Sequence, residues 1–137
     1  MTFRVYVAAS SLEYARARAA MAIVRELGCE VTLDWTQDVE RDGGNPLHLS
    51  GFARSVLARC DVDAVRESDL LWVLAPRGHA SRGQCVELGV ALALDKPILI
   101  TGEEDDRRAA IFFDLATVCR DDDTAAVTVI PALRGGR

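Results

Sequence analysis

The sequence predicts an α/β fold in which helices cover both faces of a doubly wound parallel sheet of four to five strands. First, short β-rich apolar runs alternate with longer helical patterns four or five times, and such alternation implies right-handed crossovers between parallel strands. Second, the runs Leu70–Ala75 and Ile98–Ile100 are apolar at every position, as in strands that are buried on both faces. Together these observations indicate a flavodoxin- or Rossmann-like sheet.

The first half of the chain is expected to supply two strands and two helices. In chain order, the expected elements are a strand at Phe3–Ala8, a helix from about Leu12 to Gly28, a strand at Val31–Trp35, a loop over 37–50 and a helix from near Phe52 to Glu67. Gly28 suits the position after a helix C-terminus, and Ser10 or Ser11 is available as an N-cap. The loop is polar, contains Gly43-Gly44-Asn45-Pro46, and is long enough to cover a functional site.

The second half continues the alternation. In chain order, we expect a strand at Leu70–Ala75, a loop over 76–82, a helix at Gly83–Leu94, a turn at Asp95–Pro97, a strand at Ile98–Ile100, a charged loop over 103–108, a helical turn at Ala109–Leu115, a short strand around Val118 and a final helix. Asp123 or Thr124 is the expected cap of the final helix, and Pro131 limits its length.

Composition restricts the function. The chain has 137 residues, of which 50% are hydrophobic, so a single domain over 1–137 can bury a substantial core. A net charge of -5 without a basic stripe argues against nucleic-acid binding. No apolar run reaches membrane-spanning length and no signal peptide is visible. The four cysteines are scattered, which fits reduced thiols, and the expected location is the cytoplasm.

The predicted topology brings three segments together. In open α/β sheets, ligands bind outside the carboxyl ends of the strands, at the point where the strand order reverses. The segments 8–11, Trp35 with its following loop, and 75–87 should therefore meet at one edge of the sheet. A ligand site is expected there.

Glu87 is the most conspicuous residue of that edge. From Gly83 to Leu94 every residue is apolar or glycine except Gln84 and Glu87. A carboxylate costs several kcal/mol to desolvate unless it is paired or used. Two interpretations follow from the spacing alone, a nucleophile or general base in an apolar pocket, or a structural carboxylate paired with an arginine.

The other candidates also have two interpretations each. One interpretation is that hydrogen-bond donors at two helix N-termini bind a phosphate, and the other is that these residues simply cap the helices. The residues concerned are Ser10, Ser11, Ser81, Arg82 and Gly83. Neither loop is a P-loop.

Trp35 would stack on a base or sugar, or belong to the core. Asp61 would face the cleft, or lie with Asp63 on a solvated helix face. His48 and His79 are isolated in loops and no ligand spacing exists, so no metal site is expected.

Three segments, VYVAAS, CDVDAVRESDLLWVLAP and SRGQCVELGVALALDKPILITG, occur in this order between residues 5 and 102. Together they resemble the nucleoside 2-deoxyribosyltransferase superfamily, which includes the 2′-deoxynucleoside 5′-monophosphate N-glycosidases. The resemblance implies that Glu87 is the catalytic glutamate that attacks the anomeric carbon and that Tyr6 lies beside it. It implies that Asp61 contacts the sugar or assists the leaving base.

The same resemblance bears on the substrate. Ser81 lies where the transferases usually carry an aspartate and the monophosphate hydrolases a serine that binds the 5′-phosphate. Ser10, Ser81 and Gly83 would then hold a phosphate, with Arg82 adding positive charge. The stretch ASSLEYARAR lacks the glycines common in the hydrolases, and IFFDLATV matches no catalytic motif.

The implied activity is cleavage of the N-glycosidic bond of a nucleoside 5′-monophosphate or nucleoside, with release of the base or transfer of the sugar to a second base. No metal or organic cofactor is required, the partner is a small-molecule nucleoside or nucleotide, and a homodimer or larger homo-oligomer is expected. Two alternatives remain at this point. One is a non-catalytic nucleotide-binding or sensor module of the same fold, and the other is a TIR-like NAD glycohydrolase.

Overall fold

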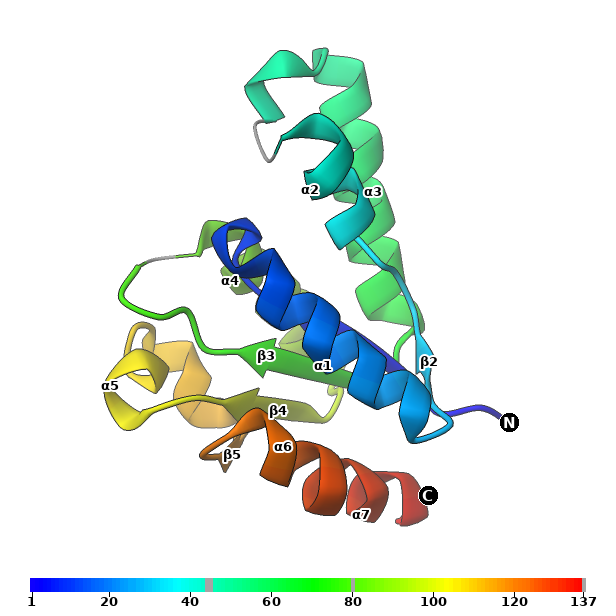
Figure 1. Ribbon diagram of the computed structural model, residues 1–137, viewed down its shortest axis with the longest axis vertical. Helices are drawn as coiled ribbons and strands as arrows, with labels where there is room; N and C mark the ends of the chain where they lie inside the picture. Colours follow the sequence, from blue (N-terminus) through cyan, green and yellow to red (C-terminus); the bar gives the residue numbers. More distant parts are fainter. Residues whose placement is uncertain (44–45, 80, 137) are drawn as a thin grey trace.

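The computed structural model describes residues 1–43, 46–79 and 81–136, and its centre is one parallel sheet of five strands (Figure 1). The strands are β1 (Arg4–Ala8), β2 (Glu30–Val31), β3 (Leu70–Leu74), β4 (Ile98–Thr101) and β5 (Thr117–Cys119). They lie in the order β2-β1-β3-β4-β5, and every neighbouring pair is parallel. The predicted α/β fold with a doubly wound parallel sheet is confirmed.

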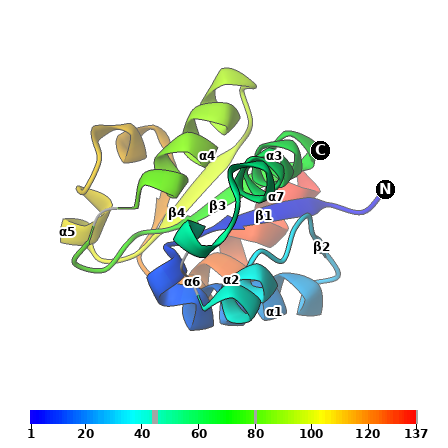
Figure 2. The ribbon, with the colours of Figure 1, turned by 90° about the horizontal axis from the view of Figure 1, so that it is seen from above.

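The helices cover both faces of the sheet. They are α1 (Tyr14–Glu26), α2 (Thr36–Asp42), α3 (Gly51–Glu67), α4 (Arg82–Ala93), α5 (Glu104–Arg107), α6 (Asp122–Thr124) and α7 (Ile130–Gly135), with 3₁₀ turns at Ser11–Glu13, Pro46–His48 and Ile111–Leu115 and a π-helical turn at Ala125–Val129. Figure 2 shows α3 and α4 on one side of the sheet and α1 on the other. No helix of the described ranges combines the length and apolarity needed to cross a lipid bilayer.

Alternation along the strands divides the core into two layers. On β1, Val5 and Val7 pack with α1, whereas Tyr6 and Ala8 pack with residues of α3 and α4. Side chains of a strand point alternately to its two faces, so a strand covered on both faces must be apolar throughout. The fully apolar β3 follows this rule, and the same alternation turns the Tyr6 side chain toward α4.

The second strand and the loop after it differ from the prediction. Strand β2 has only Glu30 and Val31, because the chain turns away from the sheet before Trp35, whose indole N–H donates to the Val7 carbonyl over 2.8 Å. Part of the predicted loop over 37–50 is helix α2, in which Arg41 pairs with Asp38 over 3.0 Å. The prediction gave too much weight to the glycine-rich end of this stretch, where Gly44 and Asn45 lie outside the described residues.

The C-terminal segment is also more helical than predicted. Asp121, rather than Asp123 or Thr124, is the cap, and its side chain accepts from the Thr124 N–H over 2.7 Å. The helical segment then passes Pro131, which lies at the start of α7, directly after the π-helical turn. A proline at the start of a helix loses no intrahelical hydrogen bond. The predicted loop over 103–108 contains the short helix α5.

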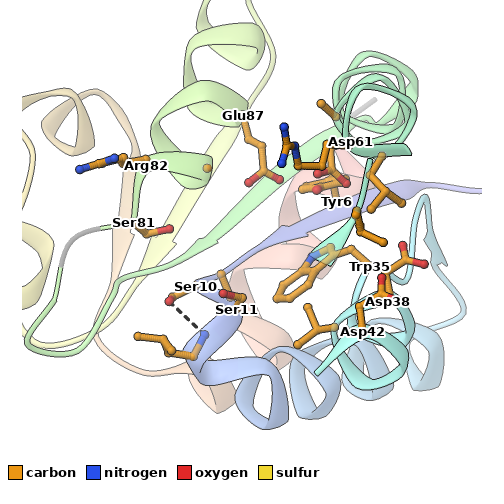
Figure 3. Close-up of a pocket in the computed structure, with 18 residues that line it drawn as sticks. Tyr6, Ser10, Ser11, Trp35, Asp38, Asp42, Asp61, Ser81, Arg82 and Glu87 are labelled. Carbon is orange, nitrogen blue, oxygen red and sulfur yellow. Dashed lines mark hydrogen bonds between the residues drawn. The ribbon is translucent and has the colours of Figure 1, made fainter. Parts of the chain in front are cut away.

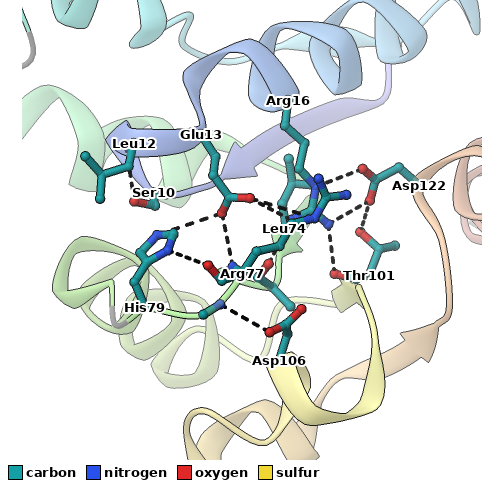
Figure 4. A network of polar contacts seen from close by, with 12 residues as sticks. Ser10, Leu12, Glu13, Arg16, Leu74, Arg77, His79, Thr101, Asp106 and Asp122 are labelled. Carbon is teal, nitrogen blue, oxygen red and sulfur yellow. Dashed lines mark hydrogen bonds and ion pairs between the residues drawn. The ribbon is translucent and has the colours of Figure 1, made fainter.

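A buried arginine joins the carboxyl ends of two strands to α1 and α6 (Figure 4). The Arg16 side chain is 10% exposed and donates to the Ala75 carbonyl over 2.7 Å and to the Thr101 carbonyl over 3.4 Å. It also donates to both carboxylate oxygens of Asp122, over 3.0 and 3.2 Å. The Thr101 hydroxyl donates to Asp122 and accepts from the indole N–H of Trp72. This network anchors the C-terminal helices on the sheet.

We expect Arg16→Met to lower the free energy of unfolding by about 3 kcal/mol, because it removes the charged partner of the Asp122 carboxylate and a donor to the Ala75 and Thr101 carbonyls. Urea denaturation at pH 7 measures the effect. The matched control is Arg108→Met, which removes an exposed pair with Glu104 and should change stability by less than about 0.5 kcal/mol. Equal effects of the two substitutions would contradict the assigned role of the network.

Candidate active site

A cavity of about 600 Å³ opens at the carboxyl edge of the sheet (Figure 3). From β1 the chain passes to β2 on one side, and β3 lies on the other, so the strand order reverses between β1 and β3. All nine site residues that the sequence predicts line this cavity. They are Tyr6, Ser10, Ser11, Trp35, Asp61, Ser81, Arg82, Gly83 and Glu87.

Helical spacing places Glu87 inside the protein. The buried residues of α4 are Gln84, Glu87, Leu88 and Ala91, which form one stripe that faces the sheet. Glu87 is only 8% exposed, although its carboxylate lines the cavity. A Cβ atom on Gly83 would lie 3.9 Å from Glu87 Oε1, so the glycine keeps the space beside the carboxylate open.

Two further polar groups meet Glu87 from other elements. Tyr6 comes from β1 and is 1% exposed, and Asp61 comes from α3, one turn before the buried Ala64 and Val65. The Tyr6 hydroxyl is close enough to interact with both carboxyl groups. Figure 3 shows the Asp61 and Glu87 side chains pointing toward the same space, with Tyr6 between α3 and α4.

Burial shifts the protonation of this cluster. Desolvation, and to a smaller extent the charge of Asp61, raises the pKa of Glu87 to about 8, although hydrogen bonding to Tyr6 opposes the shift. Burial and the charge of Asp38 raise the pKa of Asp61 to about 6, again against the hydrogen bond from Tyr6. The pKa of Tyr6 is raised by burial and by both carboxylates, so Tyr6 stays a hydroxyl donor.

The structural interpretation of Glu87, a carboxylate neutralised by a neighbouring arginine, does not fit these contacts. Among the described residues, no arginine forms an ion pair with Glu87 or with Asp61. Two carboxyl groups that share a buried site resist simultaneous ionisation, so the pair retains one proton near neutral pH. Such a cluster is costly for folding and suited to proton transfer or nucleophilic attack.

The end of the cavity near the serines offers donors. Ser10 is buried, and its side chain accepts from the Leu12 N–H over 3.2 Å, so it does act as a helix cap. Ser81 precedes α4 and its side chain makes no capping hydrogen bond. Arg82 and Gly83 begin α4, where unpaired backbone N–H groups and the helix dipole favour an anion.

The opposite end of the cavity is lined by α2 and α3. Trp35 packs against both layers of the core and also lines the cavity. Its place in the core is confirmed, and its stacking on a base or sugar stays a prediction. Asp38 and Asp42, four residues apart on α2, lie beside it, and Arg41 pairs with both. Arg54, on α3, is a further charged lining residue.

Sequence reasoning placed the loop after Trp35 at this edge but singled out no residue of it, and on α3 it named only Asp61 as a site residue. The additional polar and apolar lining residues there are Asp38, Val39, Asp42, Leu49, Arg54, Leu57 and Ala58. The i, i+4 spacing of Asp38 and Asp42 was a readable signal of one helix face, but only after residues 36–42 are recognised as a helix.

The histidines contribute no metal site to this edge. His79 Nε2 lies 3.8 Å from Glu13 and its Nδ1 is 2.8 Å from the Arg77 carbonyl oxygen. In the part of the chain that the structure describes, no three His, Cys, Asp or Glu side chains are grouped to hold a metal ion.

Solved structures with the same fold include enzymes that act on nucleosides and nucleotides. The 2-deoxyribosyltransferase of the psychrotolerant bacterium Bacillus psychrosaccharolyticus is 16% identical, with a TM-score of 0.72 over 95% of each chain. The CMP N-glycosidase of Clostridium botulinum is 21% identical, with a TM-score of 0.56 over 93% of this chain and 98% of that one. A conserved protein of Enterococcus faecalis V583 is 16% identical, with a TM-score of 0.63 over 96% and 99%.

At these identities the structures demonstrate a shared fold. No curated protein sequence matches this chain. A family model for nucleoside 2-deoxyribosyltransferase, in contrast, matches residues 5–125. That match covers most of the chain and all nine predicted site residues, and the protein therefore belongs to the nucleoside 2-deoxyribosyltransferase family.

Proposed function

We propose that this protein cleaves the N-glycosidic bond of a nucleoside 5′-monophosphate, or of a nucleoside, with Glu87 as the nucleophile. The observation that carries the proposal is a desolvated carboxylate, without an arginine partner among the described residues, in a cavity that also presents Asp61 and Tyr6. A buried carboxylate of this kind is destabilising, and proteins keep such groups mainly where the chemistry of a site needs them. Membership in the family and the names of the similar structures support the same reaction.

The reaction has two displacements. A Glu87 carboxylate oxygen attacks C1′, and the C1′–N bond breaks with its electron pair passing to the base, through an oxocarbenium-like transition state. The pair retains one proton, which the order of the two pKa values places on Glu87 in the free protein. This proton passes to Asp61 as Glu87 attacks, and Asp61 gives it to the leaving base, or Asp61 binds a sugar hydroxyl. The glycosyl ester on Glu87 is then attacked at C1′ by water or by a second base. Tyr6 can donate its single hydroxyl proton to one of the two carboxyl groups at a time.

The two ends of the cavity differ in what they offer a substrate. The α2 end, where Trp35 can stack on a ring, suits the base. The N-terminus of α4, with Ser81 and Gly83, suits the 5′-phosphate. The reacting carbon then lies between these ends, beside Glu87.

Self-association is part of the proposal. The outer face of α4 exposes Cys85, Val86 and Gly89, and the first half of α3, which stands away from the sheet in Figure 1, exposes Phe52 to 81%. Grouped apolar side chains on a surface are typical of protein interfaces. These helices support a homodimer or larger homo-oligomer.

We expect Glu87→Gln to abolish base release while leaving the fold intact, because the amide has the shape of the carboxylate but cannot form the glycosyl ester. Chromatography of free base after incubation with deoxynucleoside 5′-monophosphates, nucleosides and NAD measures the activity, and far-UV circular dichroism checks the fold. Full activity of the variant would refute the role of Glu87. Binding of nucleotides by the wild-type protein without release of base would indicate a non-catalytic module, and release of nicotinamide alone an NAD glycohydrolase.

The raised pKa of Glu87 also predicts a pH dependence of stability. The folded protein holds a proton on Glu87 between the ordinary pKa of 4.5 and the raised value of about 8, whereas the unfolded chain releases it. The Glu87 contribution to stability is therefore complete below about pH 4.5 and is lost as pH rises toward 8, by up to about 1.4 kcal/mol per pH unit. We expect Glu87→Gln to be more stable than the wild-type protein at pH 8, with a flatter profile in urea denaturation. Parallel profiles would show that the carboxyl group is not desolvated.

We expect 5′-monophosphates to be cleaved faster than the matching nucleosides, and Ser81→Ala to reduce that preference by roughly tenfold or more, since a hydrogen bond to a charged group is worth about 1.5–3 kcal/mol. The values of kcat/KM for both substrate types measure the preference. Ser55→Ala is the matched control, because Ser55 bonds to the Phe52 carbonyl on α3 and does not line the cavity. Faster cleavage of nucleosides by the wild-type protein would overturn the placement of the phosphate.

A further inference from the structure

Gln84 is a buried polar side chain that the reaction does not use. It lies in the first turn of α4 with 0% exposure. Its Nε2 donates to the Ala8 carbonyl over 2.9 Å and to the Leu74 carbonyl over 2.6 Å. Its Oε1 is buried and has no hydrogen-bond partner among the described residues. An unsatisfied buried acceptor costs about 1–3 kcal/mol of stability. If position 84 only filled space in the core, leucine or methionine would therefore give a more stable protein than glutamine.

The two acceptors are the last residues of the two central strands. Ala8 ends β1 and Leu74 ends β3, and these strands are neighbours at the point where the strand order reverses. Both carbonyl oxygens can only accept, so the orientation of the amide is fixed with its nitrogen toward the sheet. The side chain is thus a clamp that uses both of its N–H donors and leaves its oxygen unused.

The clamp connects the two elements that carry Tyr6 and Glu87. Tyr6 is two residues before Ala8 on β1, and both face the α3 and α4 side of the sheet. Glu87 is three residues after Gln84, on the same buried stripe of α4. A rotation of α4, or a shift along its axis, would break both amide hydrogen bonds and separate the Glu87 carboxylate from the Tyr6 hydroxyl.

We infer that Gln84 is a positioning residue for the reaction, which holds the first turns of α4 on the ends of β1 and β3 so that Glu87 faces Tyr6 and C1′. This inference rests on the proposed function. Misplacement of a reacting group by about 1 Å can reduce a rate about a hundredfold without a comparable loss of binding. The other α4 contacts with the substrate are backbone N–H groups and Ser81 at its start, which would tolerate a small rotation better than the nucleophile does.

The test compares Gln84→Met, which keeps the side-chain length but lacks donors, with the matched control Gln37→Met at an exposed position of α2. We expect kcat of Gln84→Met to fall by roughly ten- to a hundredfold while KM changes by less than about threefold. We also expect the pKa of Glu87, titrated by NMR of the ¹³C-labelled carboxyl group, to rise, because the Tyr6 hydrogen bond that lowers it is weakened. Gln37→Met should match the wild-type protein in both measurements.

If Gln84→Met does not fold, Gln84→Asn replaces it, because its side chain is one methylene shorter and cannot reach both carbonyls. The same kcat, KM and Glu87 pKa measurements apply to it. A folded variant with unchanged kcat and an unchanged Glu87 pKa overturns the inference, and so does a loss confined to KM. If the wild-type protein releases no base from any substrate, the proposed function fails, and the NMR titration then decides the role of Gln84 alone. A raised Glu87 pKa in the variant supports the clamp, and an unchanged pKa refutes it.

Discussion

The structure depends on the confinement of two carboxyl groups, Glu87 and Asp61, around one tyrosine hydroxyl at the carboxyl edge of the sheet. Glu87 is 8% exposed and Tyr6 is 1% exposed, so water cannot fully solvate the charges. This desolvation lowers the stability of the folded state, and it occurs at the position where the strand order reverses and a ligand can enter. The raised pKa values of both carboxyl groups follow from the same confinement, which links the stability of the fold to its chemistry.

Two buried side chains hold that edge from opposite faces of the sheet. Gln84 binds the carbonyl groups at the ends of β1 and β3 from the α4 side. Arg16 binds the carbonyl groups of Ala75 and Thr101, after β3 and in β4, from the α1 side. Buried backbone carbonyls at strand ends require donors, and Arg16 adds to the Ala75 N–H that the Thr101 carbonyl already accepts. Satisfying these carbonyls with side chains of α1 and α4 fixes both helices on the sheet, and the start of α4 is one wall of the cavity.

The parts of the molecule that could be predicted from the sequence are those in which a run of apolar residues indicates a buried segment. Strand β3 and residues 98–100 of β4 are apolar at every position because both of their faces are covered, and Glu87 is conspicuous because its neighbours on α4 are apolar. Helix α2 escaped prediction since six of its seven residues are polar and two glycines follow it in the sequence, and its face toward the cavity is defined by tertiary contacts. The early end of β2 depends on the Trp35 bond to Val7, which no local pattern indicates. The cytoplasmic location stays a prediction.

The central claim is that Glu87 forms a covalent bond to the sugar. A 5′-monophosphate substrate with fluorine at C2′ destabilises the oxocarbenium-like transition states, and a good leaving base restores the first step, so the glycosyl ester accumulates. Mass spectrometry of the intact protein and of its peptides measures the adduct. The account predicts a mass increase equal to the fluorinated sugar phosphate residue, located on Glu87. An adduct on another residue, or release of base with no adduct at any time, would contradict it.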